Sequence, residues 1–350
     1  MQVGIDVKRR DFLKSGLVGL GTLAGSQLFT ASLLGQGNQD DAAGLQVEGA
    51  ILDVHDPVII KQDDSYYLFS TGVGIPVRRS TDLQTWRVAR GGTVFQHMPE
   101  EASAFVPGAT NIWAPDISFY NDRYHLYYSV STFGSNRSAI GLATNKTLHY
   151  DDDDFEWVDH GIVFSSDGTE FYNAIDANLI LDVDNTPWMA FGSHWGGIKM
   201  IRLDYETGKQ SAEDDTLYSL AARALHPRAI EAPFIIHKGD YYYLFVSFDQ
   251  CCNGINSTYN VRVGRSEAIT GPYEDRDSVP MMEDGGTQIL FTQGRWRGPG
   301  HNAIFTEGEQ DYIVYHAYDA VQGGTPTLRI DPLEWDDDGW PFVPGMEAEA

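Results

Sequence analysis

One short pattern occurs five times along the chain, at intervals of about 55 to 70 residues. Each copy opens with a polar or acidic residue beside Pro, Ala or Asn, and an apolar stretch follows. The five openings are HDPVI (55–59), APDI (114–117), AIDANL (174–179), EAPFI (231–235) and HNAI (301–304). An aromatic-rich stretch comes about ten residues later, after turn formers such as Asn121-Asp122. Two such stretches joined by a polar turn are typical of a β-hairpin.

Repeats of this length that consist of short strands are typical of propeller blades. Helical periodicity is nearly absent, so the sequence predicts an all-β fold, a five-bladed β-propeller over residues 50–350. A β-sandwich or a β-helix is the alternative, but neither accounts for the fixed offset between each polar opening and its aromatic stretch.

The opening motifs also predict a site. The first strand of every propeller blade lines the central channel, so equivalent residues meet at one end of it. We therefore expect Asp56, Asp116, Asp176, Glu231 and His301 to converge there. Each of them alone could instead cap a turn, but five polar residues at equivalent positions favour a shared site, because unpaired buried charge is costly.

The chain has 50 acidic and 24 basic residues and a formal net charge of −26. This balance argues against nucleic acid and anionic membranes as partners. The acidic residues are spread along the chain, which favours a salt-adapted (halophilic) protein over an ordinary acidic secreted one.

The N-terminus carries Arg9-Arg10 before a Gly-rich, weakly apolar run over residues 15–34. This arrangement resembles a Tat-type export signal more than a membrane anchor. We expect residues 1–40 to hold the signal and the start of a linker, and 41–49 the rest of the linker. The protein is thus expected to be secreted, extracellular and free of the membrane after export. The adjacent Cys251 and Cys252 could form a vicinal disulfide or remain two thiols.

Six motifs carry a family resemblance. They are VHDP (54–57), WAPD (113–116), NAID (173–176), GSHWGG (192–197), IEAPF (230–234) and GHN (300–302). In this order they resemble the motifs of family 43 glycoside hydrolases, specifically the endo-1,5-α-L-arabinanases.

The resemblance implies an inverting glycoside hydrolase that acts on arabinan or arabino-oligosaccharides. Asp56 matches the general base, Glu231 the general acid, and Asp176 a third carboxylate that orients the acid. Inversion needs an acid and a base roughly 6.5–9.5 Å apart, with room for water between them, and residues of different blades suit that separation. A carboxylate near Glu231 is expected to favour the protonated form of Glu231 through like-charge repulsion.

Further roles follow from the same resemblance. The expected substrate-binding residues are His55, Trp113, Phe133, Gly134, Asn173, Ala174, Ile175, Ser193, His194 and Trp195. Trp113 matches an aromatic platform for a sugar ring, whereas Phe133 could equally pack between blades. His301 matches a residue that reaches a metal ion, usually calcium, although its residue type alone would favour a hydrogen-bonded core histidine.

Two alternatives to endo action stay open. One is an exo-acting α-L-arabinofuranosidase or β-xylosidase of the same family, which often has a β-sandwich domain after the propeller. The chain ends at about the last blade, which favours the endo enzyme. The other is a non-catalytic carbohydrate-binding propeller. We expect a monomer.

Overall fold

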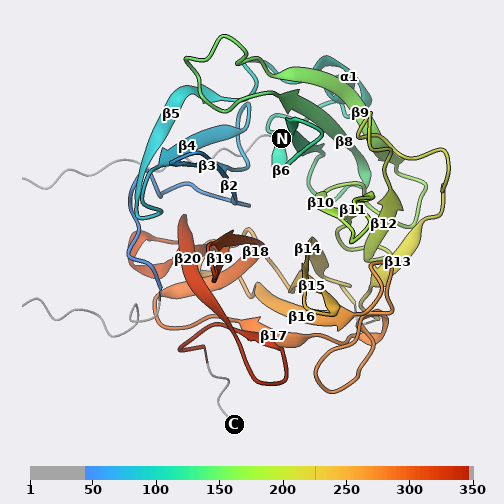
Figure 1. Ribbon diagram of the computed structural model, residues 1–350. Coiled ribbons are helices and arrows are strands. Elements are labelled where there is room, and N and C mark those ends of the chain that lie inside the picture. Colours follow the sequence, from blue (N-terminus) through green and yellow to red (C-terminus); the bar gives the residue numbers. More distant parts are fainter. Residues whose placement is uncertain (1–43, 225, 347–350) are drawn as a thin grey trace, which may run out of the picture. The chain divides into compact units, whose positions relative to one another are not determined.

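The computed structural model describes residues 44–224 and 226–346, all within a compact unit that spans Gln39–Ala350. The predicted export signal lies outside the described residues. Five antiparallel sheets are arranged around a central axis, each with its first strand innermost (Figure 1). The predicted five-bladed β-propeller is thereby confirmed.

Each blade is built in chain order from its inner strand outward. Blade one has β2 (Val58–Gln62), β3 (Ser65–Phe69), β4 (Pro76–Ser80) and β5 (Thr85–Thr93), with the short β1 (Glu48–Gly49) parallel to β5. Blade two has β6 (Trp113–Tyr120), β7 (Arg123–Val130), β8 (Arg137–Asn145) and β9 (Val158–Asp167). Blade three has β10 (Asn178–Leu181), β11 (Pro187–Phe191), β12 (Ile198–Arg202) and β13 (Tyr218–Ala221).

Blade four has β14 (Ile230–Lys238), β15 (Tyr241–Phe248), β16 (Asn260–Ser266) and β17 (Thr287–Leu290). Blade five has β18 (Trp296–Glu307), β19 (Gln310–Asp319), β20 (Thr325–Trp335) and β21 (Pro341–Phe342). Among the described residues the α-helical segment is α1 (Glu100–Phe105), between blades one and two, and the 3₁₀ turns are Gly254–Asn256, Met281–Glu283 and Ala320–Gln322.

The aromatic-rich stretches become the second strand of each blade. All five residues of β3 and of β11 are buried, and so are seven of the eight in β7 and in β15. These strands are covered on both faces by neighbouring blades, which explains why they are apolar nearly throughout instead of alternating. The aromatic side chains fill the wedge between adjacent sheets and fix the position of the inner strands.

Every opening motif contains one residue with left-handed backbone. These are Asp56 (φ 51°), Ala114 (φ 41°), Asp176 (φ 60°), Ala232 (φ 55°) and His301 (φ 49°). Its N–H donates to a polar side chain, for example from Ala114 to Thr71 Oγ1 (2.8 Å), from Asp176 to Ser129 Oγ (3.0 Å) and from His301 to Ser247 Oγ (2.8 Å). Each of these acceptors lies at the end of the preceding blade's second strand. The bonds therefore tie neighbouring blades together at the end of the channel where the openings begin.

The segment before blade one closes the ring. Leu52 forms an antiparallel bridge with Thr327 of β20, and the Leu328 N–H donates to the Ile51 carbonyl (2.9 Å). Residues 44–49 were expected to be linker, yet Leu45 and Val47 pack against the core of blade one. Apolar side chains in this segment favour attachment over a free linker.

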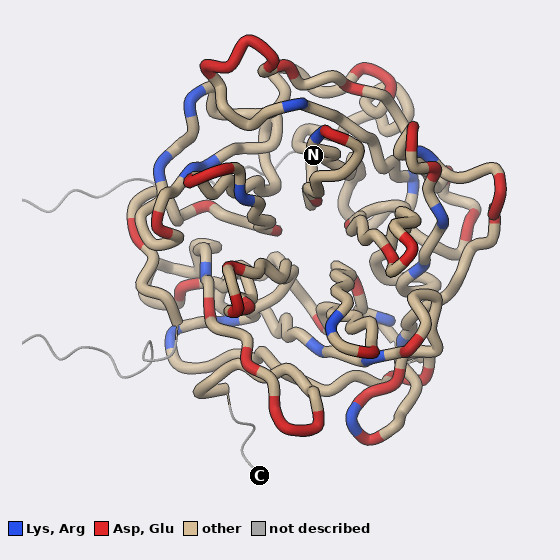
Figure 2. The backbone as a smooth tube through the Cα atoms, viewed as in Figure 1, with Lys and Arg blue, Asp and Glu red and all other residues tan. Residues whose placement is uncertain are grey.

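Acidic residues lie mainly on the outer turns and loops (Figure 2), including the exposed run 151–154. No described helix has the length and apolar character needed to span a bilayer.

Candidate active site

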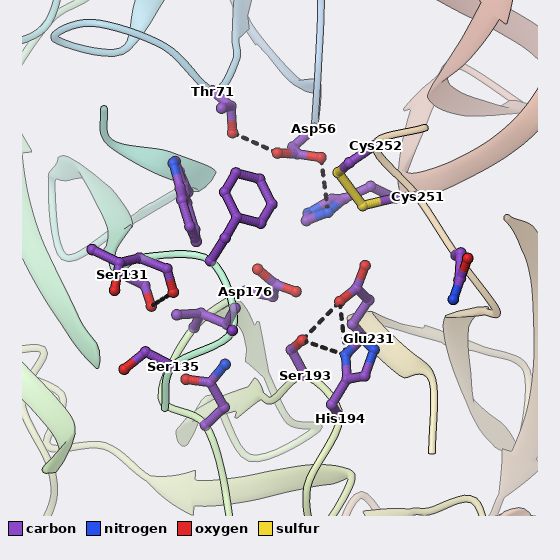
Figure 3. Close-up of a pocket in the computed structure, with 18 of the residues that line it drawn as sticks. Asp56, Thr71, Ser131, Ser135, Asp176, Ser193, His194, Glu231, Cys251 and Cys252 are labelled. Atoms are coloured by element: carbon purple, nitrogen blue, oxygen red, sulfur yellow. Dashed lines mark hydrogen bonds and ion pairs between the residues drawn. A yellow bond between two sulfur atoms is a disulfide. The ribbon is translucent and has the colours of Figure 1, made fainter. Parts of the chain in front are cut away.

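A cavity of about 620 Å³ lies at the end of the channel where the opening motifs begin. Asp56, Asp176, Glu231 and His301 all line it, each from a different blade (Figure 3). Nine of the ten predicted substrate-binding residues line it as well: His55, Trp113, Phe133, Gly134, Asn173, Ile175, Ser193, His194 and Trp195. Ala174 does not, because its side chain is fully buried in the apolar cluster between blades two and three.

Asp56 is a buried carboxylate surrounded by donors. The Thr71 hydroxyl donates to Oδ2 at 2.5 Å, while His55 Nδ1 and His301 Nδ1 lie 2.7 and 3.1 Å from Oδ1. Burial disfavours the charged form, but the charges and hydrogen bonds of His301 and His55 outweigh it and hold the pKa of Asp56 well below its usual value. Asp56 is therefore ionised at neutral pH, as a general base must be.

Glu231 lies in β14 and accepts hydrogen bonds from two hydroxyls, Ser193 to Oε2 and Tyr259 to Oε1, both at 2.7 Å. His194 Nδ1 is 3.5 Å from Oε2. Burial raises the pKa of Glu231, but the hydrogen bond and charge of His194, together with the two hydroxyls, lower it overall.

Asp176 has far fewer donors, since its Oδ2 accepts from the Ala232 N–H at 3.2 Å. Burial raises its pKa, and although His301 opposes the rise, repulsion from Glu231 and Asp56 adds to it, which places the pKa at about 7. Repulsion between Asp176 and Glu231 was expected to protonate Glu231. The directions of the two pKa shifts instead favour the proton on Asp176, because Ser193, Tyr259 and His194 all stabilise the charged form of Glu231.

Asp116 holds the equivalent place in blade two but does not line the cavity. Its Oδ2 accepts from the Leu179 N–H (2.8 Å) and its Oδ1 from Asn178 Nδ2 (3.2 Å). Burial raises its pKa to about 6. Of the five predicted channel residues, Asp116 therefore connects blades two and three, and the other four form the site.

Two aromatic rings form one wall of the cavity. The centroids of Trp113 and Phe133 are 5.0 Å apart, and their planes are inclined by 47°. Phe133 is 81% exposed, so packing between blades does not account for it. An exposed ring beside a half-buried Trp offers apolar faces to a sugar ring.

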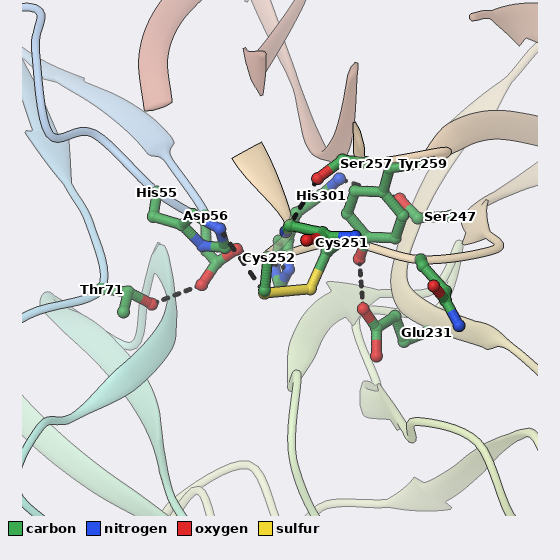
Figure 4. Close-up of a disulfide and its surroundings, with 12 residues drawn as sticks. His55, Asp56, Thr71, Glu231, Ser247, Cys251, Cys252, Ser257, Tyr259 and His301 are labelled. Atoms are coloured by element: carbon green, nitrogen blue, oxygen red, sulfur yellow. Dashed lines mark hydrogen bonds and ion pairs between the residues drawn. A yellow bond between two sulfur atoms is a disulfide. The ribbon is translucent and has the colours of Figure 1, made fainter. Parts of the chain in front are cut away.

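The opposite wall contains a disulfide between Cys251 and Cys252 (Figure 4), which decides between the two alternatives left by the sequence. The Cys252 N–H donates to the Tyr318 hydroxyl (2.7 Å), which lies 2.8 Å from His55 Nε2. The disulfide thus connects through Tyr318 to the histidine beside Asp56.

Sequence reasoning missed Thr71, Tyr259 and Tyr318. The signal for Thr71 was present, since a hydroxyl residue follows or ends the aromatic stretch in four of the five repeats (Thr71, Ser129, Ser193 and Ser247). Tyr259 and Tyr318 had no comparable signal, because Tyr259 immediately precedes β16 and follows no repeated motif, and Tyr318 is one of several aromatic residues of β19.

His301 is half-buried among carboxylates. Burial lowers its pKa, but the charges of Asp56, Asp176 and Glu231 and the hydrogen bond to Asp56 raise it to about 9. The ring of the neighbouring His316 is fully buried, and burial together with the nearby His55 keeps its pKa well below the usual value. His55, Asp56 and His316 each offer a ligand atom within 4.8 Å of one another.

Comparison with known proteins agrees with this geometry. The family model "Glycosyl hydrolases family 43" matches residues 50–341. The extracellular endo-α-(1→5)-L-arabinanase 1 of Bacillus subtilis is 44% identical over 293 residues, which is 82% of this chain and 87% of that protein. The extracellular exo-α-(1→5)-L-arabinofuranosidase ArbA of Cellvibrio japonicus is 41% identical, over 85% of this chain and 88% of its own.

Solved structures give the same result. The endo-arabinanase of Bacillus licheniformis matches with a TM-score of 0.79 and 44% identity, over 85% of this chain and 99% of that one. The Cellvibrio cellulosa α-L-arabinanase complexed with arabinohexaose matches with a TM-score of 0.80 and 40% identity, over 84% and 96%. The family match and these identities show that the chain belongs to family 43 of the glycosyl hydrolases, and the carboxylates that meet in its channel agree with its being a glycoside hydrolase.

Proposed function

We propose that the protein cleaves internal α-1,5-L-arabinofuranosidic bonds of arabinan with inversion at the anomeric carbon. The observation that carries the proposal is the division of labour among the three carboxylates. All three line one cavity, with Asp56 on one side and Asp176 and Glu231 on the other (Figure 3), and the pKa of Asp56 is lowered whereas that of Asp176 is raised. Relatives named as endo-arabinanases support the choice of substrate.

In the reaction, Asp56 takes a proton from a water molecule as the water oxygen bonds to the anomeric carbon. The bond from that carbon to the leaving oxygen breaks, and Glu231 gives the leaving oxygen its proton. Because Asp176 and Glu231 titrate together, the proton that the pair holds is the one delivered. Asp176 thereby stores the proton that Glu231 donates.

The hydrogen bonds around Asp56 also orient it. Thr71, His55 and His301 approach the carboxylate from three directions and hold the group in one position. A base positioned in this way meets its water without reorganisation. Trp113 and Phe133 line the same cavity and hold the sugar rings of the substrate there.

Exo action is the second candidate, and it is favoured by a specific observation. ArbA of Cellvibrio japonicus and an exo-1,5-α-L-arabinanase from a bovine ruminal metagenomic library are 41% and 42% identical to this chain. The products on linear arabinan separate the two. Endo action gives short oligosaccharides of several lengths from the start, whereas exo action gives one product size.

Asp56→Asn tests the mechanism. The amide keeps the size of the side chain but cannot accept the proton, so kcat should fall about 10²–10⁴-fold. Binding of arabino-oligosaccharides should remain. Wild-type turnover in this variant, or a product with retained anomeric configuration in the wild type, would refute the proposed mechanism.

We propose in addition that the channel takes a calcium ion at His301. His301 Nδ1 is engaged with Asp56, so Nε2 is the remaining ligand atom, and the three carboxylates make the channel attractive to a cation. Because those carboxylates also raise the pKa of His301 to about 9, a bound ion would have to displace the proton of Nε2. The adjacent Asn302 is buried, and neither its amide oxygen nor its amide nitrogen has a hydrogen-bond partner among the described residues, so its oxygen is a candidate ligand for an oxygen-preferring ion. When bound, the ion would supply positive charge beside the carboxylates. A fall in activity with chelator, restored by calcium, is the expected result.

The relatives named extracellular support secretion of this protein, and we propose the Tat route from the twin arginines. We also propose salt adaptation, because the chain has 50 acidic residues, those in the described part lie largely on outer turns, and they repel one another less when salt screens them. A thermal midpoint that does not rise between dilute and molar salt would contradict it.

A further inference from the structure

A second groove, of about 640 Å³, lies between the outer strands of blade one and the segment that follows β8 in blade two. It shares no residue with the catalytic cavity. Chain direction places it at the opposite end of the blades. Strand β2 begins beside Asp56 and β8 begins beside the cavity residue Ser135, whereas the turn 81–84 and residues 148–151 lie beyond the far ends of β4 and β8.

The floor of this groove carries two arginines side by side. Arg79 on β4 and Arg87 on β5 are direct antiparallel partners, so their side chains are on the same face, and Tyr67 on β3 is the next rung of the same row. Like charges directly opposite each other destabilise a sheet. Figure 2 shows basic residues on the strands labelled β4 and β5 in Figure 1.

Neither arginine has a carboxylate partner among the described residues. Arg79 donates through Nε (3.1 Å) and Nη2 (2.5 Å) to the Ser65 hydroxyl, which fixes its guanidinium, and Arg87 is exposed. The two acids that line the groove are already engaged. Asp82 accepts from the Gln84 and Thr85 N–H groups, and Asp151 pairs with Arg90. The positive pair is therefore available to an anion.

The other wall adds an aromatic ring. Tyr150 is 44% exposed and lies beside the guanidinium of Arg90, 5.1 Å from the ring centroid. Paired guanidinium groups match a carboxylate in shape and charge, and an exposed tyrosine ring packs against a sugar ring. The volume is that of a site for a few sugar units.

We propose that this groove is a second saccharide site, specific for a carboxylate-bearing sugar chain, an oligouronate. Arg79 and Arg87 hold the carboxylate, and Tyr150 lies against the adjacent ring. Because the net charge of −26 repels polyanions elsewhere on the surface, binding depends on this local pair and weakens as salt is added. Such a site would hold the enzyme on a network that contains acidic sugars while the opposite face hydrolyses a neutral chain.

The experiment is a calorimetric titration of the full protein with trigalacturonate, beside a neutral galactotriose and inorganic phosphate. The wild type should bind trigalacturonate and not galactotriose. Arg87→Gln should weaken binding about tenfold or more, as expected for loss of a charged hydrogen bond. Arg123→Gln removes an exposed arginine of blade two that does not line the groove, and this control should bind as the wild type does.

Three results would overturn the proposal: no binding by the wild type, equal binding by Arg87→Gln, or equal binding of galactotriose. Displacement of the uronate by phosphate at the same concentration would also overturn it, because it would show a general anion site. Inhibition of arabino-oligosaccharide hydrolysis by trigalacturonate would place the uronate in the catalytic cavity and overturn it as well. The titration does not depend on which bond the enzyme cleaves.

Discussion

Asp116→Asn should change how stability depends on pH and leave turnover intact. Burial raises the pKa of Asp116 from 3.8 to about 6. A carboxyl whose folded pKa is raised stabilises the fold most below its unfolded pKa, and that stability is lost as pH rises through the folded value. A rise of this size corresponds to about 3 kcal/mol in total, of which about 2 kcal/mol is lost between pH 4.5 and 7.5.

The asparagine cannot titrate, so this loss should be absent in the variant. The amide can still accept from the Leu179 N–H, but its NH₂ then faces Asn178 Nδ2, whose own oxygen is held by the Ile235 N–H. This mismatch costs about 1–3 kcal/mol at every pH. At pH 7.5 the two proteins should therefore be similar in stability, and at pH 4.5 the variant should be the weaker.

Urea unfolding of both proteins at pH 4.5 and 7.5 measures the effect. The difference between their free energies of unfolding should change by about 2 kcal/mol between the two pH values. A constant difference would show that Asp116 is ionised throughout, and the account of its burial would be wrong. The kcat of the variant at neutral pH should stay near that of the wild type. A loss comparable to that of Asp56→Asn would place Asp116 in the chemistry.

Three further results are expected. In His194→Gln, Glu231 loses a partner that favours its charged form, so its pKa rises and the alkaline limb of the kcat profile moves to higher pH; an unmoved limb would contradict the ion pair. Phe133→Ala should raise KM for arabino-oligosaccharides by about fivefold, from about 1 kcal/mol of lost ring contact, without a change in thermal midpoint, because the ring is exposed. Leu45→Ala should lower the free energy of unfolding by about 1 kcal/mol, and an unchanged value would show that the segment before blade one does not stabilise the ring.

The fold can be predicted well from the sequence because every blade of a propeller is encoded by the same repeated sequence pattern. Five openings with aromatic stretches at a constant offset require five equivalent hairpins, and equivalence places Asp56, Asp176, Glu231 and His301 at one end of one channel. The same reasoning placed Asp116 there too. It could not see that the second residue after the left-handed position points to the next blade, as Asp116 and Asn178 both do. Side-chain direction within a motif depends on a bulge that the spacing does not reveal.

Which of Asp176 and Glu231 is protonated cannot be predicted from the sequence alone. Repulsion between the two carboxylates led us to expect the proton on Glu231, whereas the directions of their pKa shifts favour it on Asp176. Which carboxylate holds the proton depends on the hydrogen-bond donors around each. For Glu231 these are Ser193 and His194 from blade three and Tyr259, which directly precedes β16 in blade four. The raised pKa of Asp176 and the lowered pKa of Glu231 favour a proton on Asp176 in the free enzyme, so we expect its transfer to Glu231 to accompany substrate binding. A sugar oxygen that displaces His194 from Glu231 would remove the partner that keeps it charged, so the substrate itself would prepare the acid.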